Sequence, residues 1–375
     1  MLTNARIVGA DGVFTGTLVV RRGRIAAVDD GRSHLAGAVD LDGDHLVPGL
    51  VELHTDNLER HLMPRPGVVW PAPLTAVLAH DAQIVAAGIT TVLDAVCVGE
   101  HRDGGGRRAI LDASVEAIRT ARDEGLLRAD HALHLRCEVA DPDVLDLFAP
   151  FADDPLLRLV SLMDHTPGQR QWTDLTVYRR LLVAEGWAEA EVPRLVAGRV
   201  EAQARFGAAH RLALAAHCRR RGIAMASHDD ATPEHVAEAV ADGIRIAEFP
   251  TTRTAAEAAH RAGLCVVMGA PNLVRGGSHS GNVAAADLAA AGLLDALSSD
   301  YVPGSLLEAA FRLHTALGHP LHRALATVSA IPAAVLGLDD RGSLAPGLRA
   351  DVVRVGSVRG HPLVRAVWCA GERRA

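Results

Sequence analysis

One stretch decides the fold: Val47-Pro48-Gly49-Leu50-Val51-Glu52-Leu53-His54-Thr55-Asp56-Asn57, an apolar run that ends in two side chains able to bind a metal. Residues i and i+2 of a β-strand point to the same face. The imidazole of His54 and the carboxylate of Asp56 therefore converge at one strand end, and such an N/O pair suits a divalent cation. A polar turn with an incidental histidine is the alternative, which this triplet alone leaves open.

The same pattern recurs along the chain. Seven further apolar runs stop at a polar or ionisable residue or a proline: Thr90–Asp94 with Ala95, Leu133–Glu138, Leu159–His165, Ile223–Asp230, Ile244–Glu248, Leu264–Pro271 and Ala296–Asp300. Helical patterns lie between them, at Arg107–Glu124, Pro233–Ala241, Thr254–Ala262 and Val283–Leu293. This alternation predicts βα units with a parallel sheet. Eight units over roughly 250 residues predict an α/β fold of the (β/α)8 TIM-barrel type, with its chemistry at the C-terminal strand ends.

The two ends of the chain form a different pattern of short strands and turns. Residues 1–47 contain apolar segments at Ala5–Val8, Gly16–Arg21 and Arg24–Val28, and residues 342–375 contain a similar one at Val364–Trp368. We expect both ends to pair into one small β-sandwich domain, with the barrel spanning residues 48–341.

Residues 172–220 are too long for one barrel helix. We predict a helical insertion after the fourth strand, made of two or three helices that break near Gly186 and Gly198. It serves either as extra packing or as a lid or subunit contact over the active site.

Composition narrows the class of protein. The net charge of −7 argues against a nucleic-acid partner, and no apolar stretch is long enough to predict a membrane span. No secretory signal is recognisable, and the five scattered cysteines indicate free thiols of a cytoplasmic protein. All 38 basic residues are arginines, which excludes a carboxylated-lysine metal bridge, a Schiff base and a P-loop lysine.

Three histidines, His54, His165 and His228, each end an apolar run. A single histidine near a strand end is commonly structural, but three at equivalent ends of one barrel predict a shared metal site.

Several carboxylates accompany these histidines. Glu138 is the candidate to bridge two ions, although a salt bridge to Arg136 is the alternative. Asp229 and Glu248 are candidates for outer carboxylates that hold a histidine tautomer.

Anion binding must rely on arginines and backbone amides. The segment after the seventh strand offers Arg275, Gly276, Gly277, Ser278 and Ser280, and barrels often bind phosphate at this place. His279 in the same segment could donate to a phosphate or to the leaving group. Further candidates for anion contacts are Gln169, Arg170, Arg65 and the glycine-rich segment 103–108. The alternative for each is a loop that only reverses the chain and binds no anion.

These residues resemble the amidohydrolase superfamily, through His54-x-Asp56 after the first strand, histidines on middle strands and Asp300 on the last. Within it the chain is similar to the PhnM family of the carbon–phosphorus lyase pathway. Five blocks carry this resemblance: Glu52–Arg60 with Pro64-Arg65-Pro66, Ser161–Gln171, Ala226–Thr232, Glu248–Thr252 and Gly269–Asn282. Two positions differ from the usual superfamily pattern. Asp56 stands where a histidine is usual, a difference that the PhnM family shares, and the lysine that often bridges two metal ions is absent.

The resemblance implies hydrolysis of α-D-ribose 1-methylphosphonate 5-triphosphate to the 5-phosphate and diphosphate. One or two divalent ions are expected, zinc first, with manganese or iron as alternatives. Their implied ligands are His54, Asp56, Glu138, His165, His228 and Asp300. Asp300 is expected as general base, with His279 as a second catalytic candidate.

Two other hypotheses stay open at this point. One is an amidohydrolase or deaminase that attacks a C–N bond, and the other is a metal-free barrel scaffold. For the leading hypothesis we expect a small triphosphorylated ribose phosphonate as partner, and a homo-oligomer, such as a dimer, in the cytoplasm.

Overall fold

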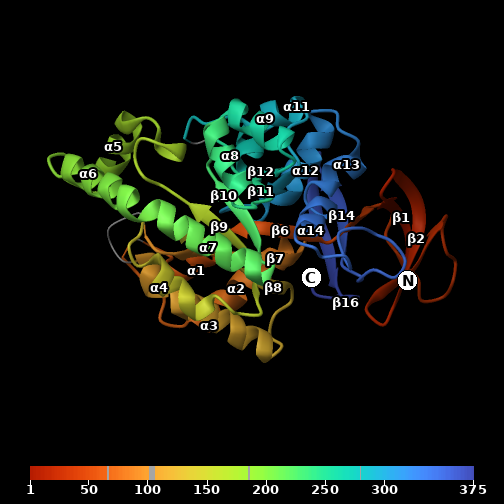
Figure 1. Ribbon diagram of the computed structural model, residues 1–375. Coiled ribbons are helices and arrows are strands. Elements are labelled where there is room, and N and C mark those ends of the chain that lie inside the picture. The colour runs from red at the N-terminus through yellow and green to blue at the C-terminus, as the bar shows by residue number, and fades with distance from the viewer. Residues whose placement is uncertain (66, 101–105, 185, 279) are drawn as a thin grey trace.

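The computed structural model describes residues 1–65, 67–100, 106–184, 186–278 and 280–375. Its central feature is a sheet of eight parallel strands in sequential order. The strands are β6 (Leu50–Thr55), β7 (Ile89–Val98), β8 (Asp130–Glu138), β9 (Leu157–Met163), β10 (Ala224–His228), β11 (Ile246–Glu248), β12 (Cys265–Gly269) and β13 (Ala296–Ser298). A parallel bridge between Thr55 and Asp300 joins the first strand to the last. The predicted barrel is confirmed (Figure 1).

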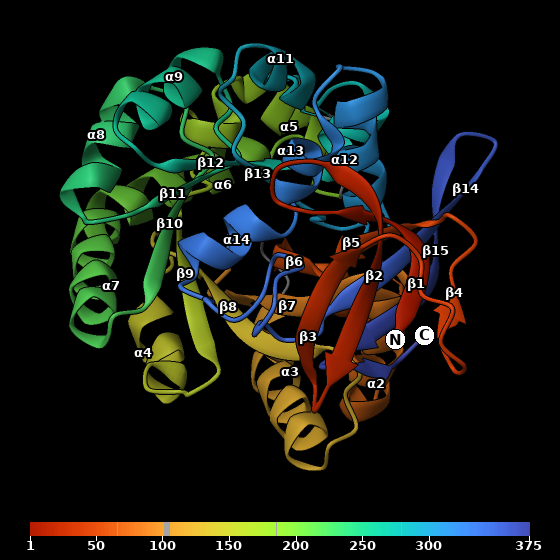
Figure 2. The ribbon, with the colours of Figure 1, turned by 90° about the vertical axis from the view of Figure 1, so that its right-hand side faces the viewer.

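Helices surround the barrel (Figures 1 and 2). They are α1 (Asn57–Leu62), α2 (Pro73–Ala86), α3 (Gly106–Asp123), α4 (Val144–Phe148), α7 (Ala208–Arg221), α8 (Pro233–Ala241), α9 (Arg253–Arg261), α10 (Ala270–Arg275), α11 (Ala285–Ala290), α12 (Ser305–Thr315) and α13 (Leu321–Ala326). The helix predicted over 283–293 is shorter than expected, because its first turn begins only after Ala284 in an extended conformation.

Two apolar layers hold the barrel together. The outer layer, which includes Leu111 and Ile118 of α3, packs the helices against the strands. The inner layer contains Leu53, Leu159 and Val267 and is covered at one end by α14 (Ala330–Val335), as Figure 2 shows. Burial of this end leaves the opposite, C-terminal strand ends as the place for the polar side chains.

Both chain ends contribute to a second sheet of eight strands. It contains β1 (Leu2–Val8), β2 (Val13–Arg21), β3 (Arg24–Asp30), β4 (Val39–Asp40), β5 (His45–Pro48), β14 (Val352–Val358), β15 (His361–Cys369) and β16 (Glu372–Arg373). Strands β5 and β14 join the two ends by antiparallel pairing, with Val47 opposite Val353. The β-rich unit built from both ends is confirmed as one hydrogen-bonded sheet over its own apolar core. The domain boundaries at 47/48 and 341/342 stay a prediction.

The helical insertion follows β9. It begins with a 3-10 turn (Arg170–Trp172) and contains α5 (Leu175–Ala184) and α6 (Val192–Ala202), and a π-helical turn (Gln203–Gly207) then connects α6 to α7. The predicted break near Gly186 is confirmed, with φ at 102°. The break at Gly198 is wrong: Gly198 lies inside α6, where open space surrounds it and the helical backbone simply continues.

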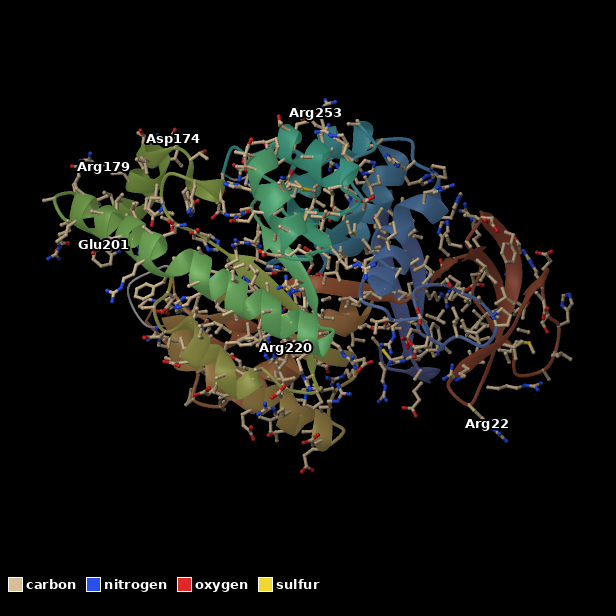
Figure 3. The ribbon with its side chains drawn as sticks, viewed as in Figure 1. Arg22, Asp174, Arg179, Glu201, Arg220 and Arg253 are labelled. Atoms are coloured by element: carbon tan, nitrogen blue, oxygen red, sulfur yellow. The ribbon has the colours of Figure 1, made fainter. Side chains whose placement is uncertain are left out.

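The insertion has a small core of its own, formed by Trp172, Tyr178, Leu182 and Val192. Charged side chains such as Arg179 and Glu201 project from its outer surface (Figure 3). Within the described residues, no helix combines the length and apolar character that a membrane crossing requires. The five cysteines are all free thiols.

Candidate active site

Three histidines from different strands meet at the C-terminal end of the barrel. His54 lies in β6, His165 follows β9 and His228 ends β10, and all three are buried. Their ring centroids are 5.8 Å apart between His54 and His228 and 5.6 Å apart between His165 and His228. The barrel thus brings together three residues that are far apart in the sequence.

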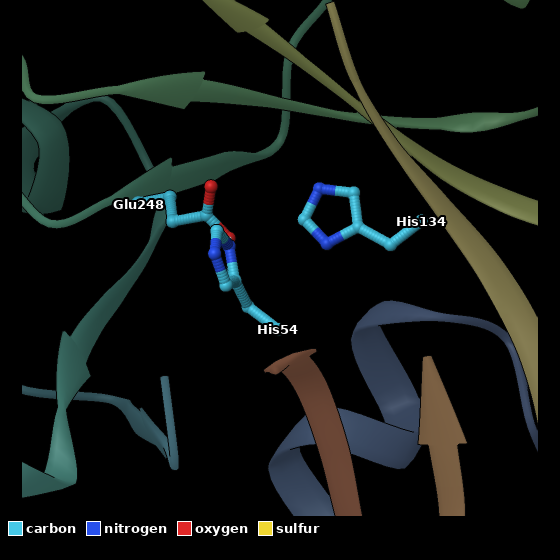
Figure 4. A group of neighbouring side chains, drawn as sticks. All are labelled: His54, His134 and Glu248. Carbon is cyan, nitrogen blue, oxygen red and sulfur yellow. The ribbon is translucent and has the colours of Figure 1, made fainter. Parts of the chain in front are cut away.

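Glu248 of β11 fixes two of these rings. Its Oε1 accepts a hydrogen bond from His54 Nδ1 and its Oε2 one from His228 Nδ1, both at 2.7 Å. Each ring therefore keeps its Nε2 for another partner. Figure 4 shows the Glu248 carboxylate against the His54 ring, with His134 to one side.

Two further residues support Glu248, and sequence reasoning missed both. Ser161 Oγ donates to Glu248 Oε2 at 2.9 Å, and His134 Nε2 lies 2.6 Å from the same Ser161 oxygen. His134 Nδ1 donates to the carbonyl of Leu53 at 2.9 Å. Both residues lie inside predicted strands and not at the strand ends where site residues were expected. Their polar side chains within these apolar strands were the only signal in the sequence.

His165 is held by Glu138. Glu138 Oε2 accepts from His165 Nδ1 at 2.6 Å, and its Oε1 accepts from the His165 backbone N–H at 3.0 Å. Glu138 thus lies behind the ring, where it fixes the tautomer. A bridging position between two ions stays a prediction, and this placement favours an orienting role.

Asp229 faces the open side of two of the rings. Its Oδ2 lies 3.4 Å from His228 Nε2 and 3.8 Å from His165 Nε2, and among the described residues this buried oxygen accepts no hydrogen bond. Its backbone adopts the left-handed region, with φ at 56°. A buried carboxylate oxygen without a partner costs free energy unless a cation or donor occupies the space beside it.

Asp56 and Asp300 approach the third ring. Asp56 Oδ1 lies 3.5 Å from His54 Nε2 and accepts from Arg136 Nη1 at 2.5 Å. Asp300, with φ at 53°, closes the barrel by bonding to Thr55 and Asp56 through its carbonyl. The strain of a left-handed non-glycine residue is typical of functional sites.

The electrostatics of this region favour a cation. Burial, followed by the Asp56 carboxylate, raises the pKa of Asp300 to about 7. Burial opposes the charge on His54, but the Glu248 and Asp56 carboxylates together outweigh it and raise the pKa of His54 to about 10. The residues fit a divalent ion in two groups of mutually close ligand atoms: His54, Asp56 and Asp300, and His165, His228 and Asp229.

These groups open into a cavity of about 420 Å³. Its lining includes His54, Asp56, His165, His228, Asp229 and Asp300 together with Arg107, Arg136, Arg275, Ser278 and Ser280. Trp172, Val177 and Leu181 of the insertion form an apolar part of its wall. The insertion therefore contributes part of the cavity wall, while its role as extra packing, lid or subunit contact stays a prediction.

A neighbouring cavity of about 600 Å³ lies between α6 and the end of β8. His165 borders both cavities, and Glu138 faces the larger one. Although it is larger, it lacks converging histidine nitrogens, so we place the chemistry in the smaller cavity.

Comparison with known proteins identifies the family. The chain is 46% identical over 376 residues to the α-D-ribose 1-methylphosphonate 5-triphosphate diphosphatase of Escherichia coli (strain K12), covering 100% of this chain and 99% of that protein. The chain belongs to this diphosphatase family. Models of protein families gave no match.

Several solved structures share the fold of this chain. The 5-methylcytosine deaminase from Klebsiella pneumoniae, liganded with phosphonocytosine, superposes with a TM-score of 0.66 at 15% identity, covering 99% of this chain and 97% of that one. The N-acetyl-D-glucosamine-6-phosphate deacetylase from Mycobacterium smegmatis has a TM-score of 0.65 at 20% identity, covering 100% and 99%. At such identities these likenesses concern the fold.

The predicted anion-binding residues of this diphosphatase separate into two sets. Arg275, Ser278 and Ser280 line the cavity, while Gly276 and Gly277 lie beside them outside its lining. Within the described residues, no hydrogen bond or ion pair engages the Arg275 side chain, which leaves its fork open to a ligand. His279 lies outside the described residues, as do residues 103–105 of the glycine-rich segment.

The other predicted anion contacts point elsewhere. Arg170 is buried behind His228, where it bonds to Asp230 at 2.5 Å and to Glu238 at 3.2 Å. Gln169 donates to Asp164 at 2.8 Å, and Arg65 is exposed outside the cavity lining. Their role in phosphate binding stays a prediction that this geometry does not favour.

Proposed function

We propose that this protein hydrolyses the α–β phosphoanhydride of α-D-ribose 1-methylphosphonate 5-triphosphate, giving the 5-phosphate and diphosphate, with the help of one or two divalent ions. The observation that carries the proposal is the convergence, in one cavity, of His54, His165 and His228 with an Asp229 oxygen and an Arg275 side chain that have no hydrogen-bond partner among the described residues. This arrangement fits a polyphosphate anion held beside a cation. The name of the 46% identical relative agrees with it.

The candidate metal ligands divide into the two groups given above, around His54 and around His165 with His228. When bound, a divalent cation acts as a Lewis acid toward phosphoryl oxygens and makes water more acidic. We expect zinc, with manganese or iron as alternatives, because imidazole and carboxylate ligands suit all three. Glu248 and Glu138 orient the rings by accepting their Nδ1 protons.

Asp300 is the proposed proton acceptor. It lies beside Asp56 at the seam of the barrel and lines the same cavity as Arg275. A carboxyl group with a pKa near 7 suits a residue that takes a proton from attacking water and later releases it.

Arg275, Ser278 and Ser280 are the proposed donors to the phosphoryl oxygens. A guanidinium group can form two parallel hydrogen bonds with a phosphate, and hydroxyls supply further donors. Preorganised donors stabilise the charge that develops on these oxygens in the transition state.

Hydrolysis of a C–N bond is the second candidate, since the deaminase and the deacetylase share the fold. A neutral substrate leaves Arg275 without a counter-charge among the described residues, whereas a phosphoanhydride supplies one, so this arginine favours the phosphoanhydride. The retained ligand set also argues against a metal-free scaffold. Homo-oligomeric assembly and a cytoplasmic location stay predictions.

Incubation of the metal-loaded protein with the triphosphate, followed by 31P NMR, tests the proposal. Diphosphate and the 5-phosphate are the expected products. Release of inorganic phosphate alone would contradict cleavage of the α–β anhydride. No turnover of the triphosphate, together with activity on a cyclic amide or an aminopyrimidine, would instead favour hydrolysis of a C–N bond.

A further inference from the structure

Two arginines face Arg275 from the other side of the cavity. Arg136 lies on β8, the third barrel strand, and Arg107 lies in the first turn of α3, after the second strand. Arg275 follows β12, the seventh strand. In a closed barrel of eight strands the third and seventh strands are diametrically opposite, so the cationic groups stand on opposing walls.

Both arginines keep donors that the protein does not use. Arg136, whose side chain is 7% exposed, bonds to Asp56 through Nη1, but its buried Nε has no hydrogen-bond partner in the part of the chain that the structure describes. Arg107 contacts both Glu59 oxygens through Nε alone, at 3.1 Å. Among the described residues, no hydrogen bond engages its two Nη atoms. Both side chains line the cavity, which places the Arg107 Nη atoms and the Arg136 guanidinium group beside a ligand that binds there.

The two guanidinium groups also disfavour each other. Burial lowers the pKa of Arg107, and the positive charge of Arg136 lowers it further. Cys97, Glu59 and Asp56 together outweigh both causes, so the pKa of Arg107 is raised. Asp56 is moreover shared between Arg136 and His54, at 2.5 and 3.5 Å. An anion placed between the two arginines relieves this repulsion and satisfies the unused donors.

We propose that Arg107 and Arg136 form a second anion subsite, which receives the phosphonate at C1 of the ribose. This inference rests on the proposed function, in which the substrate carries anionic groups at both ends. The Arg275 wall, with its serines and glycines, offers many donors and takes the diphosphate portion. The pair of Arg107 and Arg136 suits the phosphonate, which is a compact group with few oxygens. In this arrangement the reacting phosphorus lies between the Arg275 wall and the arginine pair.

The test compares two substrates that differ only at C1: the methylphosphonate triphosphate and ribose 5-triphosphate. Arg107→Gln is the main variant, since Arg136→Gln also removes the partner of Asp56. Arg108→Gln is the matched control, because the neighbouring Arg108 pairs with Asp141 and Asp143 outside this cavity. Arg275→Gln serves as the opposite-wall variant.

We expect Arg107→Gln to lower kcat/KM for the phosphonate substrate by roughly ten- to a hundredfold, as loss of a charged hydrogen bond does, with little change for ribose 5-triphosphate. Arg275→Gln should lower both. Arg136→Gln should show the same substrate selectivity as Arg107→Gln, with metal content measured beside it. Equal losses on both substrates in Arg107→Gln, or no loss on either, would overturn the subsite.

A binding measurement separates this proposal from the proposed function. Ribose 1-methylphosphonate 5-phosphate carries the phosphonate but no anhydride, and calorimetry reports its affinity without turnover. Weaker binding to Arg107→Gln than to the wild type and Arg108→Gln supports the subsite even if the wild type releases no diphosphate. Unchanged affinity overturns the subsite even if diphosphate release confirms the activity.

Discussion

Two buried clusters of histidine and carboxylate residues lie in the same barrel, and only one has the features of a site. The first is the active-site cluster described above. The second, which we name the wall cluster, consists of His80, Asp81, Asp94 and His131, between α2 and strands β7 and β8. Both clusters contain residue types that bind metals, and the histidines of both are buried, although Asp56 and Asp300 of the active-site cluster are partly exposed.

The clusters differ in how their polar atoms are used. In the wall cluster Asp94 bonds to His80 Nε2 and His131 Nδ1, both at 2.8 Å, while Asn57 and Asp81 contact the remaining ring nitrogens at 2.9 and 3.3 Å. In the active-site cluster the Nε2 atoms face a cavity. Ligand atoms that face a cavity, rather than ligand residue types alone, therefore distinguish a metal site from a structural network.

The largest effect should come from Asp300→Asn, which preserves size but cannot take a proton. Loss of a general base typically lowers kcat by ~10²–10⁴. Asp94→Asn in the wall cluster should instead lower thermal stability and leave kcat within a small factor. Turnover, metal content and melting temperature of both variants check this. Equal kinetic losses in the two variants would erase the distinction between the clusters.

Arg275→Ala should follow, with a loss of ~10²–10³ in kcat, as for other preorganised donors to transition-state charge. Metal content and fold should survive, because no described residue bonds to this side chain. Steady-state kinetics with metal analysis measure both. A normal rate would show that the loop after β12 only turns the chain.

Glu248→Gln should weaken metal binding by ~10–100-fold, the usual effect of removing a carboxylate that orients a histidine ligand. A glutamine amide cannot accept both Nδ1 protons of His54 and His228. Competition with a chelator reports the affinity directly. Asp81→Asn, in the wall cluster, is the matched control, and loss of metal there would contradict the assignment of the wall cluster as structural.

The smallest effect concerns pH. Burial opposes the charge on His131, but the Asp94 and Asp81 carboxylates together outweigh it and raise the pKa of His131 to about 9. Since the folded pKa exceeds the ordinary value of 6.5, this contribution to stability is complete below 6.5 and lost as pH rises through about 9. The melting temperature should drop by a few degrees over that range. The His131→Gln variant should lack the decrease in melting temperature that comes from His131. If the wild type and the variant show the same dependence of melting temperature on pH, the His131–Asp94 ion pair is not its source.

The sequence predicted the barrel because its strands are apolar runs with a polar end, and each of the eight expected strands forms. The wall cluster and the Ser161–His134 support stayed hidden, since their partners lie on different strands or on helix α2, and no spacing along the chain reports contact between elements. Arg170 illustrates the same limit: its position after the fourth strand fits an anion contact, but a left-handed backbone, with φ at 48°, turns it toward Asp230. Gly198 shows a further limit: a glycine lowers the expectation of a helix, but α6 continues through it.

The sheet built from both chain ends has a consequence for biosynthesis. Strand β5 pairs with β1 on one side as soon as both are made, but its other side waits for β14, which is translated after the whole barrel. An unpaired strand edge is a template for association with other chains. During translation, aggregation should therefore begin at this edge, and chaperones that cover extended apolar segments should act here until β14 arrives.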